Sequence, residues 1–160
     1  GTRCGALDPG AVLYLMEIEK LSLQEVGHLL YHQSGLLGLS GVSPDPRVLL
    51  AQAPGNARIE AALALYVRRI VREIGALVAV LGGLDMLVFT AGIGEHNTVL
   101  RDRICEGLAY LGVALSPQAN AQNALLISSP ASRVPVAVEP TNEEWIAAWH
   151  TAALVGKPPG

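Results

Sequence analysis

Charged residues are scarce in this chain of 160 residues. Asp, Glu, Lys and Arg make up only 16% of it, and the formal net charge is -3. No run of Lys or Arg occurs, so nothing favours a polyanionic partner such as nucleic acid. The apolar stretch from Leu77 to Leu81 ends at Gly82 and is too short to cross a bilayer. No signal-peptide pattern is present at the start. We therefore expect a globular protein that binds neither nucleic acid nor a membrane.

Cysteine and lysine are also scarce. Cys4 and Cys105 lie far apart in the sequence, and we expect both to be free thiols, as in the reducing cytoplasm. The only lysines are Lys20 and Lys157, and neither lies in a glycine loop. The pattern Gly-x4-Gly-Lys-Ser/Thr is absent, which excludes a P-loop nucleotidase on motif grounds.

Apolar residues, by contrast, make up 51% of the chain, which is enough for one domain with a hydrophobic core. The chain does not begin with Met, and its last residues have the composition of a linker. We therefore expect a piece of a longer protein, with one domain over residues 1–155 and a loose tail over residues 156–160.

Local signals place helix starts in the first half. Asp8 with Pro9, and Asp45 with Pro46, are cap residues followed by proline at the first helical position. Ser22 and Glu25 have the spacing of a capping box. Apolar residues three and four apart predict one long helix over residues 56–81. The glycine-rich residues 35–41 are predicted to form a loop.

The second half alternates between strand and helix patterns. Residues 86–90 predict a buried strand, residues 91–95 a tight turn, and Asn97 or Thr98 the start of a helix. Residues 134–138 predict another strand, whereas residues 113–115 and 125–127 are weaker strand candidates. A last helix is expected over about 142–155. The sequence thus predicts an α/β fold with fewer strands than so many helices need, which missing upstream strands would explain.

The segment Gly92–His96 is the first candidate site. Glycines between a strand and a helix let the backbone approach a ligand, and the following helix offers free N–H groups. That arrangement suits a nucleotide. A tight connection without any ligand explains the same pattern, and Asn97 stands where a dinucleotide fingerprint has its third glycine.

Two carboxylates near the start of the last helix form the second candidate site. Thr141 and Glu144 have capping-box spacing, so we expect Glu144 to fold back onto the backbone. Glu143 is then the freer carboxylate, at the end of a strand, where it could hold Mg²⁺. Alternatively, both glutamates merely interact with the helix dipole.

Charged residues in the first half are weaker candidates. The Arg3 guanidinium could hold a phosphate or carboxylate, although a solvated surface arginine is the simpler interpretation. Asp45 could accept hydrogen bonds from ribose hydroxyls and Arg47 could lie against adenine. More simply, Asp45 caps a helix and Arg47 is an exposed residue of its first turn.

Four segments together resemble one known family. Gly1–Pro9 (GTRCGALDP), Tyr31–Gly41 (YHQSGLLGLSG), Leu87–Glu95 (LVFTAGIGE) and Pro140–Glu144 (PTNEE) resemble, in this order, signature segments of acetate kinases. The resemblance extends to about Val155. Four long segments in register are far more specific than a single Gly-x-Gly.

The resemblance implies an activity and a fold. Acetate kinases transfer the γ-phosphoryl group of ATP to acetate with Mg²⁺, reversibly forming acetyl phosphate, and are cytoplasmic homodimers of two-domain subunits. The implied fold is an incomplete ribonuclease-H-like domain of the acetate/sugar kinase–actin superfamily. Residues 1–155 would be part of the second, nucleotide-binding domain, with early strands upstream of Gly1. The helix at about 142–155 would cross toward the missing first domain.

The resemblance also implies residue roles. Arg3 matches the family's catalytic arginine, and Glu143 matches its magnesium ligand. The residues that match nucleotide contacts are Asp45, Pro46, Arg47, Gly92, Ile93, Gly94, Glu95 and His96. An arginine and Mg²⁺ suit phosphoryl transfer, which depends on charge stabilisation.

Two positions depart from the family pattern. His96 stands where the family usually has Asn, which puts nucleotide affinity in doubt, and Cys4 replaces a common Ser with little expected effect. The acyl pocket and other ligands are expected outside this sequence, so we expect negligible kinase activity from the chain alone. Propionate or butyrate kinase, or a non-catalytic nucleotide-binding or dimerisation fragment, remain alternatives. The long helix over residues 56–81 is the candidate for dimer contacts.

Overall fold

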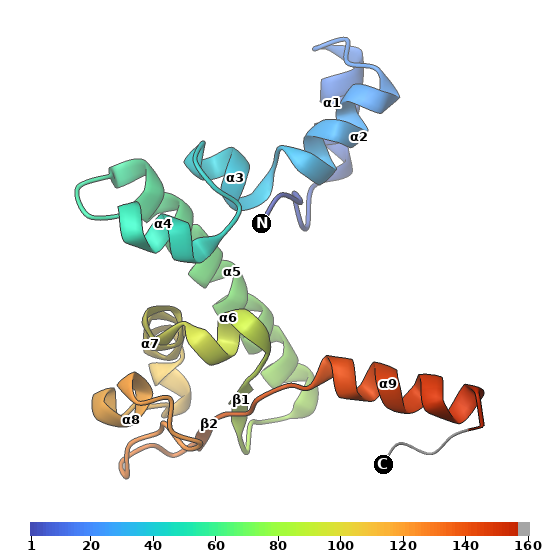
Figure 1. The fold of residues 1–160 in the computed structure, drawn as a ribbon. Helices are drawn as coiled ribbons and strands as arrows, with labels where there is room; N and C mark the ends of the chain where they lie inside the picture. Colours follow the sequence, from blue (N-terminus) through green and yellow to red (C-terminus); the bar gives the residue numbers. More distant parts are fainter. Residues whose placement is uncertain (157–160) are drawn as a thin grey trace. The chain divides into compact units, whose positions relative to one another are not determined.

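A computed structural model describes residues 1–156, with the side chain of Glu143 left out. Contacts group the chain into two compact units, Gly1–Glu73 (unit 1) and Ile74 onward (unit 2) (Figure 1). Most of the predicted loose tail, from Lys157 onward, lies outside the described residues. The assignment of residues 1–155 to one domain stays a prediction.

Unit 1 is helical. Its elements are α1 (Pro9–Glu17), α2 (Leu23–His32), α3 (Gly35–Ser40), α4 (Pro46–Gln52) and the first part of α5 (Ala57–Leu81). The predicted starts are confirmed: Asp8 accepts from the Gly10 N–H at 2.7 Å, Asp45 accepts from the Arg47 N–H at 2.8 Å, and Ser22 and Glu25 form a capping box. The long helix is confirmed within one residue of its predicted start.

The loop predicted for residues 35–41 is wrong, because α3 forms there. The Arg58 side chain, from α5, donates to the carbonyl oxygens of Leu39 at 2.9 Å and of Gly38 at 3.5 Å. Carbonyls in the last turn of a helix have no partner within the helix, and these bonds satisfy two of them. Gly41 then ends α3 with a φ of 71°.

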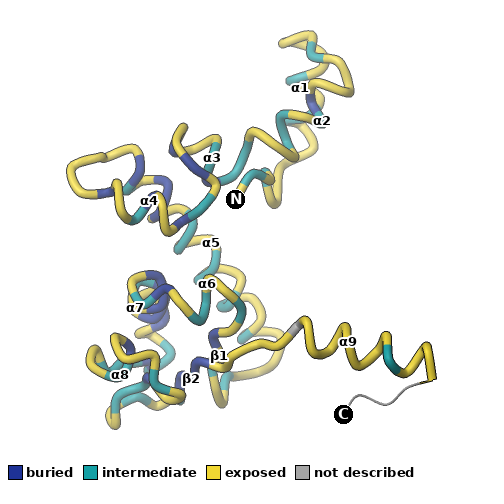
Figure 2. The backbone as a smooth tube through the Cα atoms, viewed as in Figure 1, coloured by how far each residue is buried: buried dark blue, intermediate teal, exposed yellow. Residues whose placement is uncertain are grey.

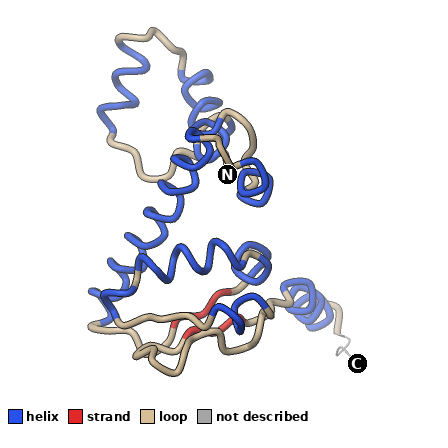
Figure 3. The backbone as a smooth tube through the Cα atoms, turned by 90° about the vertical axis from the view of Figure 1, so that its left-hand side faces the viewer, coloured by secondary structure: helices blue, strands red, loops and turns tan. Residues whose placement is uncertain are grey.

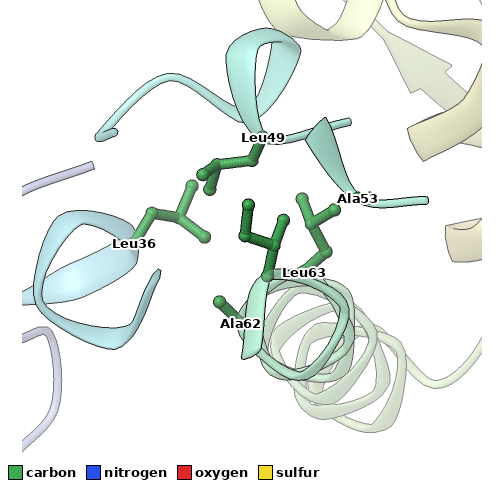
Figure 4. Packing of buried hydrophobic residues seen from close by; sticks show 6 residues of the cluster. Leu36, Leu49, Ala53, Ala62 and Leu63 are labelled. Carbon is green, nitrogen blue, oxygen red and sulfur yellow. The ribbon is translucent and has the colours of Figure 1, made fainter. Parts of the chain in front are cut away.

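The core of unit 1 lies where α3, α4 and α5 meet (Figure 4). Leu49, Ile59 and Leu63 are fully buried there, and Leu36 of α3 packs with them at 4% exposure. Burying such side chains stabilises a fold by roughly 1.5–3 kcal/mol each. This packing keeps the short helix α3 in place against α5.

Unit 2 contains a two-stranded parallel sheet of β1 (Leu87–Phe89) and β2 (Val136–Val138) (Figure 3). The remaining elements are α6 (Ala91–His96), α7 (Thr98–Gly107), the 3-10 turn η1 (Ala109–Leu111), α8 (Pro117–Ala121) and α9 (Glu143–Leu154). The weak strand candidates at 113–115 and 125–127 are wrong as strands, since they contribute only isolated bridges, Leu115 with Ser128 and Leu126 with Ala137. The α/β class is confirmed.

The tight turn predicted for residues 91–95 is also wrong, because these residues form the short helix α6. Ala91 opens it with a φ of 58°, a conformation that is costly for a residue other than glycine. The next helix, α7, begins as predicted: the Asn97 side chain accepts from the Leu100 N–H at 3.0 Å. Leu100, Ile104 and Leu108 of this region are buried in the core of unit 2.

The last helix is confirmed, but its predicted cap is wrong. Asn142, not Thr141, caps α9, and its side-chain oxygen accepts from the Trp145 N–H at 2.9 Å. No residue of α9 whose side chain is described is buried (Figure 2). Packing into a core therefore does not hold this helix.

Two further expectations concern thiols and membranes. Cys4 and Cys105 are both free, as predicted, and burial raises the pKa of the Cys105 thiol to about 12. Among the residues that the structure describes, no helix is long and apolar enough to cross a membrane.

Candidate functional site

Arg3 lies in an extended segment that unit 1 holds by its backbone. The N–H of Cys4 donates to Leu30 O and that of Ser34 to Thr2 O, each at 2.9 Å. The Arg3 side chain is exposed and lines a cavity of about 800 Å³. That volume is in the range of small-molecule sites. The segment is thus fixed while its guanidinium extends into open space.

Within the part of the chain that the structure describes, the Arg3 guanidinium has no hydrogen-bond or ion-pair partner. Two other arginines line the same cavity, both from α5, and both are engaged. Arg69 donates to Ala6 O at a long 3.4 Å, and Arg72 pairs with Glu73 at 2.7 Å. Nothing in the sequence singled out these α5 residues. Arg3 is therefore the arginine of this cavity whose guanidinium has no partner among the described residues.

Gly35 allows the Arg3 segment to lie where it does. Its φ is +59°, and a Cβ at this position would come within 2.7 Å of Gly1 O and 2.9 Å of Arg3 O. Both the backbone conformation and the space require glycine. The first two segments of the family resemblance are therefore in direct contact within unit 1.

Asp45 and Arg47 pair with each other. The two side chains form an ion pair at 2.7 Å, and the Arg47 guanidinium holds the pKa of the Asp45 carboxyl below its ordinary value. Arg47 is exposed, whereas Pro46 is buried. The structural role of both residues, a helix cap and a first-turn cation, is confirmed. Their contact with a nucleotide stays a prediction. For Pro46, the burial of the residue argues against a direct contact.

The glycines of segment 92–96 do not have positive φ, so conformation is not what requires them. A Cβ on Gly94 would touch Phe89 at 3.4 Å, an ordinary contact, and one on Gly92 would meet nothing within 4 Å. No contact within the described chain requires glycine at position 92. The open space there leaves the backbone accessible to a ligand.

Arg101 of α7 supports this segment from within unit 2, and sequence reasoning missed it. Its side chain is 1% exposed and donates to Gly94 O at 2.8 Å and Glu95 O at 2.7 Å. It also donates to Asn120 Oδ1 and O and to Asn123 Oδ1. Burial lowers the pKa of the guanidinium. The end of α6 is therefore capped by a buried cation.

Glu95 connects two of the predicted site segments. One of its carboxylate oxygens, Oε1, accepts from the Thr141 N–H at 2.9 Å and from the Thr141 hydroxyl at 3.0 Å. The Thr141 backbone N–H is the main cause of a lowered pKa for Glu95. His96, next to it, is 71% exposed. Residues 92–96 and 140–144 thus meet in unit 2, although the Glu143 side chain lies outside the described residues.

A Mg²⁺ ion at this site would need oxygen ligands from carboxylates. The described residues contain no group of three or more His, Cys, Asp or Glu side chains able to hold a metal. Proteins usually bind Mg²⁺ through one or two carboxylates together with water and substrate phosphates. A single carboxylate at Glu143 fits that pattern. Arg3 and residues 45–47 lie in unit 1, whereas residues 92–96 and 140–144 lie in unit 2, so their convergence on one ligand stays a prediction.

Comparison with known proteins decides the family. A model of the acetokinase family matches residues 1–149. The chain belongs to the acetokinase family. It is 52% identical over 156 residues to an acetate kinase of Rhodopseudomonas palustris and 50% identical over 155 residues to one of Methylocella silvestris. The matches cover 96% and 97% of this chain but only 39% and 38% of those proteins.

Solved structures agree with this family assignment. The acetokinase-family chain superposes on an acetate kinase of Porphyromonas gingivalis with a TM-score of 0.86 at 38% identity, over 96% of this chain and 40% of that one. A propionate kinase of Francisella tularensis gives a TM-score of 0.85 at 33% identity, over 92% and 38%. The predicted family and fold, a partial domain of the acetate kinase fold, are confirmed. The chain spans about two fifths of the length of these relatives.

Proposed function

We propose that this chain is the nucleotide-binding part of a longer acetate kinase of the cytoplasm, which transfers the γ-phosphoryl group of ATP to acetate. The observation that carries the proposal is Arg3, whose guanidinium is unpaired in the described chain and lines a cavity of about 800 Å³. A phosphoryl group in transfer spreads negative charge over its oxygens, and a fixed guanidinium stabilises that charge. Arg3 is therefore the proposed catalytic residue.

The other residues bind and orient in this proposal. Gly92 offers open backbone to the phosphates, together with Ile93 and Gly94, while Asp45 and Arg47 contact the adenosine. Glu143 holds Mg²⁺, which would neutralise phosphate charge when bound. His96 replaces the usual Asn at the end of α6. Its side chain is exposed and leaves the backbone of residues 92–94 accessible in this proposal.

The proposed enzyme needs sequence beyond this chain. The matched relatives are more than twice as long, and we infer an in-frame upstream part of about 240 residues, which would bring the protein to an ordinary two-domain length. Reading the gene upstream of the Gly1 codon tests this directly. The chain alone is expected to produce negligible acetyl phosphate from ATP, Mg²⁺ and acetate, and robust production would contradict the proposal.

A chimera tests the catalytic role. Residues 1–155 would replace the matching segment of the R. palustris acetate kinase, which is 52% identical here. We expect acetyl phosphate formation by this chimera. Arg3→Ala should lower kcat by about 100-fold or more, as loss of a transition-state donor does. Arg68→Ala, which removes an exposed arginine of α5, is the matched control. An inactive chimera that folds, or full activity with Arg3→Ala, would refute the assignment.

Acetate is preferred over propionate as the acceptor because the relatives near 50% identity are named acetate kinases. The propionate kinase structure at 33% identity keeps the longer acid as the alternative. A non-catalytic fragment would instead bind ATP without any chimeric activity.

We also propose a homodimer through this domain, with α5 as the contact, because Leu77, Val80 and Leu81 of α5 are exposed. Sedimentation of the chain as a strict monomer would count against it.

A further inference from the structure

The carboxylate of Glu95 lies in a segment proposed to hold phosphates, where its negative charge would repel them. In the structure, however, this carboxylate binds Thr141. Oε1 accepts both the N–H and the hydroxyl of Thr141, at 2.9 Å and 3.0 Å, across 46 residues of sequence. The Glu95 side chain is only 13% exposed, and its other oxygen lies 4.0 Å from His96 Nε2. Glu95 is thus occupied within the chain rather than available to a nucleotide.

The contact between Glu95 and Thr141 lies at the start of α9, a helix with few other contacts among the described residues. No described side chain of α9 is buried, so hydrophobic packing does not fix the helix. Its start is held through the connection that follows β2. The Glu139 N–H donates to Phe89 O at 2.9 Å, and two residues later Thr141 is bound by Glu95. These contacts attach both sides of Pro140 to β1 and α6.

Glu95 itself is held in place by Arg101. The Glu95 carbonyl and that of Gly94 accept from the buried Arg101 guanidinium, which anchors α6 to α7. A continuous series of hydrogen bonds therefore runs from Arg101 through Glu95 to Thr141. Asn142, the cap of α9, comes next in the chain.

We propose that Glu95 is a positioning residue that fixes the first turn of α9, and with it the backbone of Glu143, relative to the glycine-rich segment 92–96. Its consequence for metal binding rests on the proposed function, because Glu143 is there the Mg²⁺ ligand. Residues that orient a metal ligand usually change metal affinity by 10- to 100-fold when they are replaced. Glu95 acts through Thr141 and does not contact the reacting groups.

The chain itself offers a probe of this role. Its only two tryptophans, Trp145 and Trp149, both lie in α9, so tryptophan anisotropy of the 160-residue chain reports on this helix alone. Glu95→Ala should lower the anisotropy. Glu95→Gln should retain most of it, because one amide oxygen can accept both bonds. Glu106→Ala, which removes an exposed carboxylate from α7, should change nothing.

A second variant guards against misfolding. Thr141→Val removes the hydroxyl but keeps the N–H, and should give an anisotropy between the unsubstituted chain and Glu95→Ala. Far-UV circular dichroism identifies any variant that fails to fold. Unchanged anisotropy in folded Glu95→Ala, or in Thr141→Val where Glu95→Ala does not fold, would overturn the proposal.

Kinetics in the R. palustris chimera then separate positioning from direct contact. Glu95→Ala should raise the Mg²⁺ concentration for half-maximal rate by about tenfold, with Glu95→Gln close to the unsubstituted chimera. If Glu95 bound Mg²⁺ directly, Glu95→Gln would lose as much as Glu95→Ala, and the positioning role would be wrong. An inactive unsubstituted chimera would refute the proposed function instead, and the anisotropy would still decide the role of Glu95.

Discussion

Each unit of the molecule contains a short glycine-rich helix whose last carbonyls are capped by an arginine from a later helix. In unit 1, Arg58 of α5 donates to two carbonyls of α3. In unit 2, Arg101 of α7 donates to two carbonyls of α6. Arg58 is exposed, whereas Arg101 is 1% exposed and also binds Asn120 and Asn123. The arginine that caps α3 is thus at the surface, whereas the arginine that caps α6 is in the interior.

This difference indicates which of the two short helices depends on its capping arginine. Water can replace an exposed donor, but acceptors buried without a donor lose most of their hydrogen-bond energy. The α3 region can therefore do without Arg58, since core packing and the Gly35 contact also hold it. None of residues 92–96 is buried, so no core packing supports this segment and it depends more on Arg101.

Replacing each arginine by Met tests this contrast and should give the largest effect. Arg101→Met leaves five hydrogen bonds unmade, two of them buried and three partly buried, and should lower the free energy of unfolding by about 3 kcal/mol or more. Arg58→Met should lower it by less than about 1 kcal/mol. Urea unfolding followed by circular dichroism measures both. Equal losses would show that burial does not separate the two caps.

A second test concerns unit 1, where main-chain packing rather than a side chain holds the Arg3 segment. Gly35→Ala should destabilise the chain by about 2 kcal/mol or more, because it combines a positive φ with a Cβ too close to two carbonyl oxygens. Gly27→Ala, in α2 where a Cβ meets nothing, should stabilise by about 0.5–1 kcal/mol. Urea unfolding would contradict this view if the two variants behaved alike.

A third test uses pH to release the contact in unit 2. Because the pKa of Glu95 is lowered in the folded chain, its contribution is complete above the ordinary value of 4.5 and is lost as the pH falls through the lowered value. His96, whose Nε2 lies 4.0 Å from the other carboxylate oxygen, also contributes to the lowered pKa of Glu95. Tryptophan anisotropy should stay level down to about pH 4.5 and fall below it. Glu95→Gln should lack this step, and an identical step in that variant would assign it to another group.

The smallest expected effect on stability is at Arg47. Its ion pair with Asp45 is exposed, and such pairs contribute little. Arg47→Met should leave the urea midpoint unchanged, as should Arg68→Met on α5. In the chimera, however, Arg47→Met should raise the KM for ATP several-fold with kcat nearly unchanged, because it removes binding common to ground and transition states. An unchanged KM would remove Arg47 from the proposed nucleotide site.

Local signals predicted much of this fold. Asp8, Asp45 and the Ser22–Glu25 box mark helix starts because each cap forms within three residues of sequence. The spacing of apolar residues predicted α5 almost to its ends. Clusters of strand-forming residues located β1 and β2, although not how many strands would form.

What the sequence did not predict depends on partners that lie outside the helix concerned. Helices α3 and α6 contain poor helix formers, and their carbonyls are capped by arginines that no local pattern links to them. The expected cap at Thr141 failed because its hydroxyl is bound by Glu95. Local chemistry singled out Gly92–His96, Glu143, Arg3, Asp45 and Arg47 as candidates, and the family resemblance supplied their roles. Arg101 carried no signal of its own, because only the folded chain brings it beneath α6.

The burial of Arg101 has an electrostatic consequence. All five of its acceptors are neutral carbonyl or amide oxygens, so its partners orient dipoles toward the charge without cancelling it. Arg101 therefore contributes a positive charge beneath residues 94 and 95, which offsets the negative charge of the Glu95 carboxylate in the same segment. Mobile ions screen buried charges much less than exposed ones. An anion held at this segment will keep that part of its attraction at ionic strengths that abolish the pull of surface arginines.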